Sequence, residues 1–248
     1  MKQKVRILLP CYNEEQNLPK LLTRVGNLAE QMPYIALEVV IVNDGSKDNT
    51  IGVANDFQMA IPKIIVDVQP NKGLANAMRQ GLKAGAEGLN ENDIVVALDG
   101  DDSHNPMLIE SMIKQVNEGS DVVIASRFQP GSRVYGLTKF REFTGWAAGM
   151  MFRLFIPIKG VRDFTCGFRA YKVEMLNTVN AKYGDKLIEE QGFACMAEII
   201  IKMGKTGAII HEMPMILRFG RKQPLSISCN GQVLGVKDFQ DGILNVVL

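Results

Sequence analysis

The sequence predicts an α/β fold, in which a mostly parallel, doubly wound central sheet carries helices on both faces. Three observations predict it. Short continuous apolar runs recur along the first half of the chain, as in strands buried on both faces of a parallel sheet. Segments with helical spacing lie between these runs, and polar residues follow each run. The predicted strands are 4–10, 37–44, 63–69, 93–99 and 121–126.

The predicted helices alternate with these strands at 14–31, 48–59, 73–88 and 106–118. Strand–helix–strand repetition implies right-handed crossovers. In the third helix, Gly73, Gly81 and Gly85 are expected to allow close packing on the sheet.

The alternation weakens after residue 126. Residues 163–170 are expected to form a tight loop, 192–203 a helix and 208–219 a strand. The last two predicted segments are a mobile loop at 219–232 and a weak amphipathic helix at 233–248.

Composition narrows the class of protein. The chain has 248 residues, of which 46% are hydrophobic and 22% charged, as in an ordinary globular domain. A net charge of +1 gives no sign of a polyanion-binding surface, so no nucleic-acid partner is expected. The four cysteines are isolated, which signals neither a zinc site nor a disulfide framework. Because Met1 leads directly into a strand-like run, we expect no signal peptide and a cytoplasmic location.

The most membrane-like segment is 143–158, which is too short for a span and is interrupted by Arg153. Two interpretations stay open. One is a helix packed in the core or on a partner. The other is a helix in a membrane interface, with Trp146, Phe152 and Phe155 dipping into the lipid.

Polar residues gather where the predicted strands end, at 10–15, 43–48, 69–73, 99–102 and 126–127. The carboxyl ends of parallel strands share one edge of a sheet, where ligands bind. We therefore expect all five groups to converge on one site. Helix capping by Ser46, Asp48 or Asn105 accounts for one or two groups, but not for all five.

The stretch VALDGDDSHNP at 96–106 places three carboxylates at one strand end, where an unpaired buried charge is costly. Asp99 and Asp101 can both point toward the strand end, with Gly100 giving the backbone room. Carboxylate oxygens suit Mg²⁺ or Mn²⁺, which usually completes its shell with phosphate oxygens and water. A cation that faces a diphosphate is therefore expected. The chain lacks a dinucleotide fingerprint after its first strand and lacks a P-loop.

Four motifs resemble the inverting family-2 glycosyltransferases of the Rossmann-like GT-A fold. They are PCYNEEQNL at 10–18, VNDGSKDNT at 42–50, NKGLANAMRQGLKAG at 71–85 and DGDDSHNP at 99–106. Two later stretches are similar to the polyprenol-phosphate (dolichol-phosphate) mannosyl- and glucosyltransferase branch. They are VRDFTCGFRAY at 161–171 and HEMPMILRFGRKQPLS at 211–226.

The resemblance implies a metal-dependent hexosyltransferase that uses a nucleotide-diphospho-sugar such as GDP-mannose or a UDP-hexose. The implied metal is Mg²⁺ or Mn²⁺, and the implied acceptor is a polyprenyl phosphate. The resemblance also implies peripheral attachment to the cytoplasmic membrane face, with or without a membrane partner subunit. A single domain over 1–248 is expected, with a nucleotide-sugar-binding half at 1–126, an acceptor half at 127–228 and a C-terminal helix at 229–248.

The resemblance implies residue roles as well. The donor would be bound by Pro10, Tyr12, Glu14, Asp44, Lys72, Gly100 and Ser226. Asp99 and Asp101 would hold the metal, and Arg127 and Arg141 would receive the acceptor phosphate. Arg221 would lie with Ser226 on a loop that closes over the diphosphate. The implied catalytic residues are Asp99, Asp101, Arg127, Arg141 and Arg221.

Two other functions stay open. A hydroxyl acceptor must lose a proton, so it would need a carboxylate base, for which Glu198, Glu190 and Asp163 are candidates. A phosphate acceptor is already an anion and needs guanidinium groups instead. The second alternative is a non-catalytic sugar-nucleotide-binding subunit.

Three residues allow both a structural and a functional interpretation. Asp163 is expected either to form an Asx-turn or to orient Arg169 or the acceptor. Glu198 is expected in a structural ion pair rather than in contact with the acceptor. His104 is expected to cap or hydrogen-bond locally rather than to ligate a metal.

Overall fold

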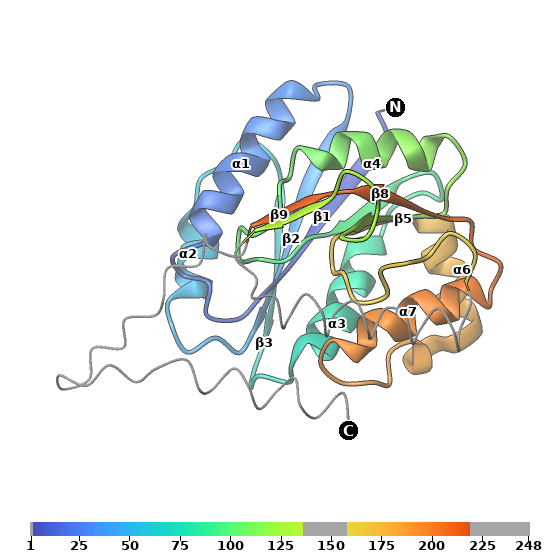
Figure 1. Ribbon diagram of the computed structural model, residues 1–248. Coiled ribbons are helices and arrows are strands. Elements are labelled where there is room, and N and C mark those ends of the chain that lie inside the picture. The colour runs from blue at the N-terminus through green and yellow to red at the C-terminus, as the bar shows by residue number, and fades with distance from the viewer. Residues whose placement is uncertain (1, 136–157, 219–248) are drawn as a thin grey trace.

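The computed structural model describes residues 2–135 and 158–218 (Figure 1). The strands are β1 (Lys4–Cys11), β2 (Ala36–Asp44), β3 (Lys63–Val68), β4 (Ile94–Ala97), β5 (Val122–Ser126), β6 (Arg133–Tyr135), β7 (Arg169–Lys172), β8 (Ile210–Pro214) and β9 (Ile216–Arg218). The helices are α1 (Leu18–Gln31), α2 (Thr50–Asp56), α3 (Leu74–Ala86), α4 (Leu108–Asn117), α6 (Val173–Tyr183), the 3₁₀ helix η1 (Gly184–Leu187) and α7 (Ala194–Gly204).

Seven strands form the central sheet in the order β3-β2-β1-β4-β7-β5-β8. Every pairing is parallel except those of β7, which runs antiparallel to both β4 and β5. The predicted mostly parallel sheet is therefore confirmed. The strand β7 was missed, because it lies at the end of the segment for which a loop was predicted. The region predicted as one strand at 208–219 holds two strands, β8 and β9, and β9 pairs with β6 in a separate ribbon.

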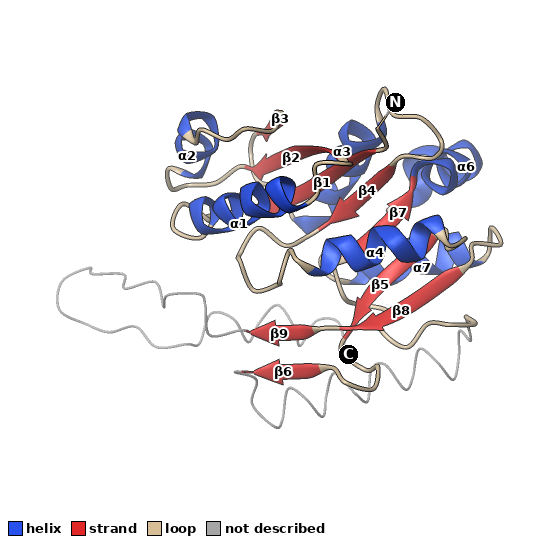
Figure 2. Ribbon diagram, turned by 90° about the horizontal axis from the view of Figure 1, so that it is seen from above, coloured by secondary structure: helices blue, strands red, loops and turns tan. Residues whose placement is uncertain are grey.

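The helices cover both faces of the sheet. Figure 1 and Figure 2 show α1 and α4 on one face and α3, α6 and α7 on the other. Strands β1 and β4 lie between these layers, and their apolar side chains are almost fully buried. The continuous apolar runs of the sequence therefore correspond to strands with two covered faces.

Two glycines let α3 approach the sheet, as predicted. A Cβ added to Gly81 would lie 2.3 Å from Cδ1 of Leu8, and one added to Gly85 would lie 3.1 Å from Cγ1 of Val95. The prediction was wrong for Gly73, which has a φ of +84° at the helix N-cap and no heavy atom near the Cβ position. This glycine permits a left-handed backbone rather than close packing.

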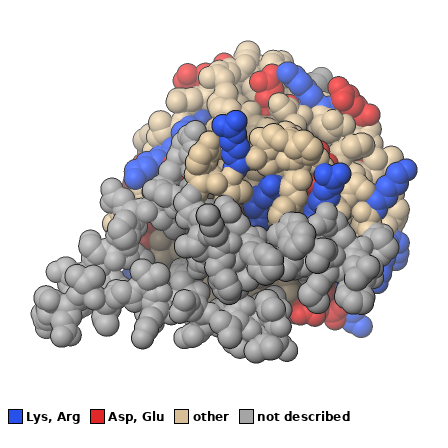
Figure 3. Space-filling view, in the orientation of Figure 1, with Lys and Arg blue, Asp and Glu red and all other residues tan. Residues whose placement is uncertain are grey.

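The parallel arrangement brings the carboxyl ends of β1, β2, β3, β4 and β5 to one edge, as predicted from the sequence. None of the described helices is long and apolar enough to cross a membrane. Acidic and basic side chains are interspersed on the face drawn in Figure 3, in keeping with the small net charge. The predicted segments 143–158, 219–232 and 233–248 lie outside the described residues, apart from Ile158.

Candidate active site at the carboxyl edge of the sheet

The acidic end of β4 packs directly on the end of β1. A Cβ added to Gly100 would lie 2.6 Å from Sγ of Cys11 and 2.9 Å from the carbonyl oxygen of Pro10. Only glycine fits there, so Asp99 and Asp101 are brought beside the end of β1. Burial raises the pKa of the Cys11 thiol, and the negative charges of Glu14, Asp101, Asp48 and Asp99 raise it further. Negative charge is therefore concentrated where the predicted cation would bind.

The third carboxylate of the cluster points elsewhere. Asp102 has a φ of +56° and is buried. It forms an ion pair with Arg24 of α1, whose guanidinium also donates to the carbonyl oxygen of His104 and to Oδ1 of Asn105. Asp102 therefore anchors the loop after β4 to α1, which leaves Asp99 and Asp101 as the pair at the site.

His104 lies behind this pair. Its ring is 4% exposed and packs at 5.3 Å from the ring of Phe168. Nδ1 lies 3.7 Å from Oδ2 of Asp99 and has no hydrogen-bond partner in the described structure. We expected His104 to form a local hydrogen bond through its side chain, but Nδ1 forms none. Oδ1 of Asn105 accepts the N–H of Met107 at 3.4 Å, but α4 has Met107 at its N-cap and no side-chain cap hydrogen bond, so the predicted cap by Asn105 is not formed.

The residues fit a divalent cation that is shared with a ligand. Among the described residues, no three His, Cys, Asp or Glu side chains are arranged to enclose a metal ion. Two neighbouring carboxylates at an acidic strand end suit the partial coordination by which Mg²⁺ or Mn²⁺ bridges protein and phosphate oxygens. The chemistry of the pair therefore agrees with the expected cation, which would draw its other ligands from a diphosphate and water.

The ends of β1 and β2 are tied together by side-chain hydrogen bonds. The N–H of Asn13 donates to Oγ of Ser46 at 3.0 Å, and the N–H of Glu14 donates to Oγ1 of Thr50 at 2.8 Å. Asp48 accepts the N–H of Thr50 at 3.0 Å, but α2 has Asn49 at its N-cap and no side-chain cap hydrogen bond, so the predicted cap by Ser46 or Asp48 is not formed. Tyr12 lies next to these hydrogen-bonded residues, and its side chain is 41% exposed. An aromatic ring that is held but uncovered can stack on a nucleobase.

Asp44 is buried at the end of β2, where it supports a neighbouring loop. Its buried carboxylate accepts the N–H of Lys72 at 3.1 Å and that of Gly73 at 2.7 Å. Its carbonyl oxygen accepts Nδ2 of Asn71 at 2.7 Å. Asp44 thus holds the loop that presents the exposed Lys72. Glu14 is also buried, and it accepts Nδ2 of Asn17 at 2.7 Å.

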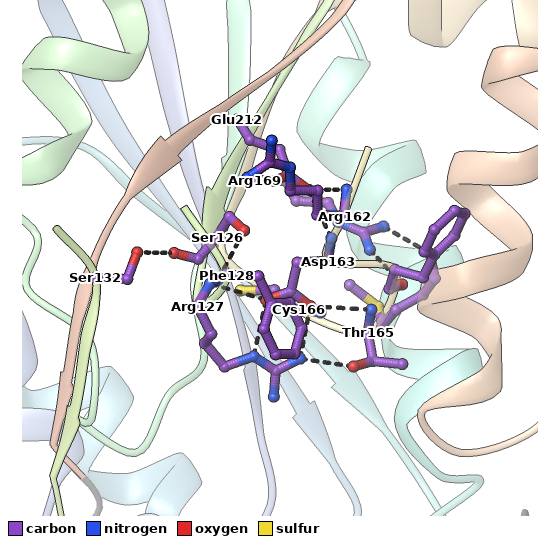
Figure 4. A network of polar contacts seen from close by, with 12 residues as sticks. Ser126, Arg127, Phe128, Ser132, Arg162, Asp163, Thr165, Cys166, Arg169 and Glu212 are labelled. Atoms are coloured by element: carbon purple, nitrogen blue, oxygen red, sulfur yellow. Dashed lines mark hydrogen bonds and ion pairs between the residues drawn. The ribbon is translucent and has the colours of Figure 1, made fainter. Parts of the chain in front are cut away.

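Arg127 projects from the end of β5 and is held by Asp163 (Figure 4). Nε and Nη2 donate to the two carboxylate oxygens of Asp163 at 2.8 and 2.6 Å, and Nη2 also donates to Oγ1 of Thr165 at 2.6 Å. Hydrogen bonding and charge from Arg127 lower the pKa of the fully buried Asp163, against the effect of burial. The negative charges of Asp163, and to a smaller extent Asp99, raise the pKa of Arg127.

Asp163 forms the Asx-turn, which is one of the two roles that the sequence left open. Its Oδ1 accepts the N–H of Thr165 at 3.3 Å and that of Cys166 at 3.1 Å, which is an Asx-turn. The side chain that it orients is Arg127, not Arg169. The guanidinium of Arg169 is fully buried behind the turn and donates to the carbonyl oxygens of Met196 and Phe164 at 2.6 and 2.7 Å.

Glu212 of β8 is a supporting residue that sequence reasoning missed. Its Oε1 accepts the N–H of Arg162 at 2.5 Å and that of Asp163 at 2.6 Å (Figure 4). Its other oxygen accepts Nε2 of Gln129 at 3.1 Å. A lone acidic residue in a strand carries no signal of this role, because its partners lie 49 to 83 positions away in the chain.

Two of the three candidate bases are engaged elsewhere. Glu198 accepts the N–H groups of Glu189 and Glu190 at 2.7 and 2.9 Å and pairs with Lys202 at 2.5 Å. The expected structural ion pair is thus confirmed, and hydrogen bonds with Lys202 and the two backbone groups lower the pKa of Glu198 despite partial burial. Asp163 is held by Arg127 with a lowered pKa. Both are therefore poor proton acceptors.

The remaining predicted site residues are only partly placed. Pro10 is half-buried beside Gly100. Arg141, Arg221 and Ser226 lie outside the described residues. The structure thus brings Pro10, Tyr12, Lys72, Asp99, Asp101 and Arg127 to the same edge of the sheet.

The sheet order, the single antiparallel strand and the acidic end of β4 define the class as a GT-A-type glycosyltransferase fold. Residues 6–179 match the family Glycosyl transferase family 2, and the chain belongs to this family.

Named relatives are similar over most of the chain. The dolichol-phosphate mannosyltransferase of Pyrococcus furiosus is 31% identical, over 85% of this chain and 55% of the relative. The chain therefore spans about half the length of that relative. The polyprenol monophosphomannose synthase of Mycolicibacterium smegmatis is 27% identical, over 86% of this chain and 77% of the relative.

Solved structures share the fold. The mannosyl-3-phosphoglycerate synthase of Rubrobacter xylanophilus aligns with a TM-score of 0.65 at 20% identity, over 99% of this chain and 72% of that chain. The glucosyl-3-phosphoglycerate synthase of Mycobacterium tuberculosis, in complex with Mn²⁺, UDP-glucose and glycerol 3-phosphate, aligns with a TM-score of 0.61 at 19% identity, over 90% of this chain and 74% of that chain.

Proposed function

We propose that this chain transfers a hexose from a nucleotide-diphospho-sugar to a polyprenyl phosphate with inversion at the anomeric carbon. The observation that carries the proposal is Arg127, which is held in place at the same edge as Asp99 and Asp101. The names of the Pyrococcus and Mycolicibacterium relatives support a lipid-phosphate acceptor and a mannosyl donor.

The donor would lie across the ends of β1, β2 and β4. Tyr12 would stack on the base, while Pro10, Glu14 and Asp44 would shape the base and ribose pocket. Lys72 would neutralise phosphate charge, and Gly100 would let the donor approach the backbone. Asp99 and Asp101 would hold Mg²⁺ or Mn²⁺, which when bound would stabilise the charge on the leaving diphosphate.

The acceptor side needs a cation and no base. A phosphate monoester is anionic near neutral pH, and a guanidinium matches its oxygens. Nε and Nη2 of Arg127 face Asp163 and Thr165, so Nη1 is the nitrogen that would bind the phosphate. We propose that Arg141 adds a second cation and that Arg221 and Ser226 close over the diphosphate. Positioning and electrostatics would supply most of the rate.

Asp163 and Glu198 are both ion-paired, which favours transfer to a phosphate over transfer to a hydroxyl group. Asp163 and Glu198 both have lowered pKa values, whereas a general base works best with a pKa near the operating pH. A polyprenyl phosphate resides in a membrane, so we propose that the protein acts at the cytoplasmic membrane face, alone or docked on a membrane subunit.

The test is release of nucleoside diphosphate in the presence of Mn²⁺ or Mg²⁺. GDP-mannose, UDP-glucose and UDP-N-acetylglucosamine would each be assayed with and without a short polyprenyl phosphate, with Asp101→Ala as the control. We expect release that requires the lipid phosphate, stops with EDTA and is lost in the control. Release that follows hydroxyl acceptors instead would contradict the acceptor. Donor binding without release under any condition would indicate a binding subunit.

A further inference from the structure

Residues 163–167 form a turn that touches both sides of the candidate site. Asp163 at its start accepts two hydrogen bonds from the guanidinium of Arg127, and Gly167 at its end packs on Asp99. We infer that this turn is a positioning element that sets the placement of Asp99 relative to Arg127. The inference rests on the proposed function, in which these two residues serve the donor and the acceptor.

The turn can approach Asp99, on the side of the sugar donor, because Gly167 has no side chain. A Cβ at this position would lie 2.7 Å from Oδ1 of Asp99, which is closer than such atoms approach in folded proteins. The φ of Gly167 is not in the left-handed region, so alanine introduces no backbone strain. The three heavy atoms nearest to this Cβ position all belong to the carboxylate of Asp99, which must rotate or move when alanine is introduced.

On the side of the acceptor phosphate, the position of Arg127 depends on the negative charge of Asp163. Its carboxylate fixes Nε, Nη2 and the backbone N–H of Arg127, the last at 3.0 Å. The positive charge of Arg169 behind the turn also lowers the pKa of Asp163. Arg127 uses Nε, Nη2 and its backbone N–H to bind Asp163 and Thr165, which leaves Nη1 to face a phosphate.

The turn is itself braced from two directions. Glu212 binds the N–H groups of Arg162 and Asp163 at its start. Arg169, which is fully buried, binds the carbonyl oxygen of Phe164 in its middle. A braced turn cannot relax to absorb a new methyl group, so the displacement falls on Asp99.

The spacing matters for an in-line displacement. The attacking phosphate oxygen and the leaving diphosphate must lie on opposite sides of the anomeric carbon. A misplacement of about 1 Å costs on the order of 100-fold in rate. A single short segment that touches both Asp99 and Arg127 can hold that geometry.

The donor arm of the test compares Gly167→Ala with Gly26→Ala. Gly26 lies in α1 with no heavy atom within 4 Å of its Cβ position, so it controls for the substitution itself. Binding of Mn²⁺ with a nucleoside diphosphate would be measured by calorimetry and by electron paramagnetic resonance. We expect Gly167→Ala to weaken binding about tenfold or more, as for residues that orient metal ligands. Gly26→Ala should bind as the wild type does.

The acceptor arm uses Asp163→Asn and Thr165→Val, with the distant, exposed Glu174→Gln as the control. Asparagine keeps an oxygen for the turn but points an N–H₂ at the donors of Arg127. We expect the KM for farnesyl phosphate to rise about tenfold or more in Asp163→Asn. A smaller rise is expected in Thr165→Val, which removes one bond and keeps the shape. The affinity for Mn²⁺ and nucleoside diphosphate should change less than twofold in both.

The outcomes separate this inference from the proposed function. Wild-type affinity for Mn²⁺ and nucleoside diphosphate in a folded Gly167→Ala protein would overturn the inference, whatever the turnover. An unchanged KM in both Asp163→Asn and Thr165→Val would overturn it equally. If the wild type shows no lipid-phosphate-dependent release, yet Gly167→Ala selectively weakens Mn²⁺ binding, the proposed acceptor is wrong and the donor side of the positioning role stands.

Discussion

Asp102 forms an ion pair with Arg24, although it directly follows Asp101 in the chain. The left-handed backbone of Asp102 turns its carboxylate away from the site and toward α1. The neighbouring carboxylates of Asp101 and Asp102 therefore face different surroundings, and substitutions can separate the proposed metal-binding role of Asp101 from the structural role of Asp102.

The first prediction compares Asp101→Asn with Asp102→Asn. Asparagine tolerates the left-handed conformation, so the second change removes only charge. We expect Asp102→Asn to lower the free energy of unfolding by about 1–3 kcal/mol, through loss of a charge-assisted bond, with Mn²⁺ affinity unchanged. Asp101→Asn should lose Mn²⁺ binding while the unfolding free energy stays close to that of the wild type. Urea unfolding and calorimetry check both, and the reverse pattern would reassign the metal ligand.

The second prediction concerns contact between the ends of β2 and β3. A Cβ on Gly45 would lie 2.2 Å from the backbone nitrogen of Asn71, at a φ of +64°. Gly88 has a similar φ of +68° but no heavy atom within 4 Å of its Cβ position. Gly88→Ala should cost about 1–2 kcal/mol from backbone strain alone. Gly45→Ala should cost more than Gly88→Ala and should also weaken donor binding, because the loop that carries Lys72 is displaced.

The third prediction is a pH dependence of stability that comes from Asp163. Its pKa is lower in the folded protein than in the unfolded chain. The stabilisation is therefore fully present above the unfolded value of about 3.9 and is lost as the pH falls through the folded value. The difference in unfolding free energy between wild type and Asp163→Asn should be constant from about pH 7 to pH 5 and shrink as the pH falls below about 4. A difference that stays the same at pH 3 would contradict the charged pair.

The fourth prediction tests the hydroxyl-acceptor alternative through Glu198. Since its carboxylate is engaged by Lys202 and two backbone N–H groups, Glu198→Gln should leave kcat within about twofold. The same change should lower the unfolding free energy by about 1 kcal/mol, because the ion pair and its hydrogen bonds are weakened. A fall of about 100-fold in kcat, with stability unchanged, would instead identify a general base.

Local sequence carried most of the information about the fold. The runs KVRILLPC of β1 and ALEVVIVND of β2 are strands because continuous apolar segments of this length fill a sheet covered on both faces. The run RAYK of β7 gave no such signal, because it has four residues and begins with an arginine. That arginine is fully buried; its Nη1 and Nη2 donate to the carbonyl oxygens of Met196 and Phe164, whereas its Nε has no hydrogen-bond partner among the described residues. Its burial could not be predicted from the neighbouring residues.

The candidate site likewise has features that the sequence predicts and features that depend on the fold. The order of residues is enough to predict that polar residues follow five parallel strands and that Asp99 and Asp101 lie at one of these ends, because strand direction and alternation are local properties. The folded structure is needed to show that Asp102 faces Arg24, that Asp163 holds Arg127 and that Gly167 packs on Asp99. Each of these contacts joins segments far apart in the chain; Arg127 and Asp163, for example, are 36 positions apart. Side-chain partners over such distances depend on how the whole sheet packs, which no local pattern encodes.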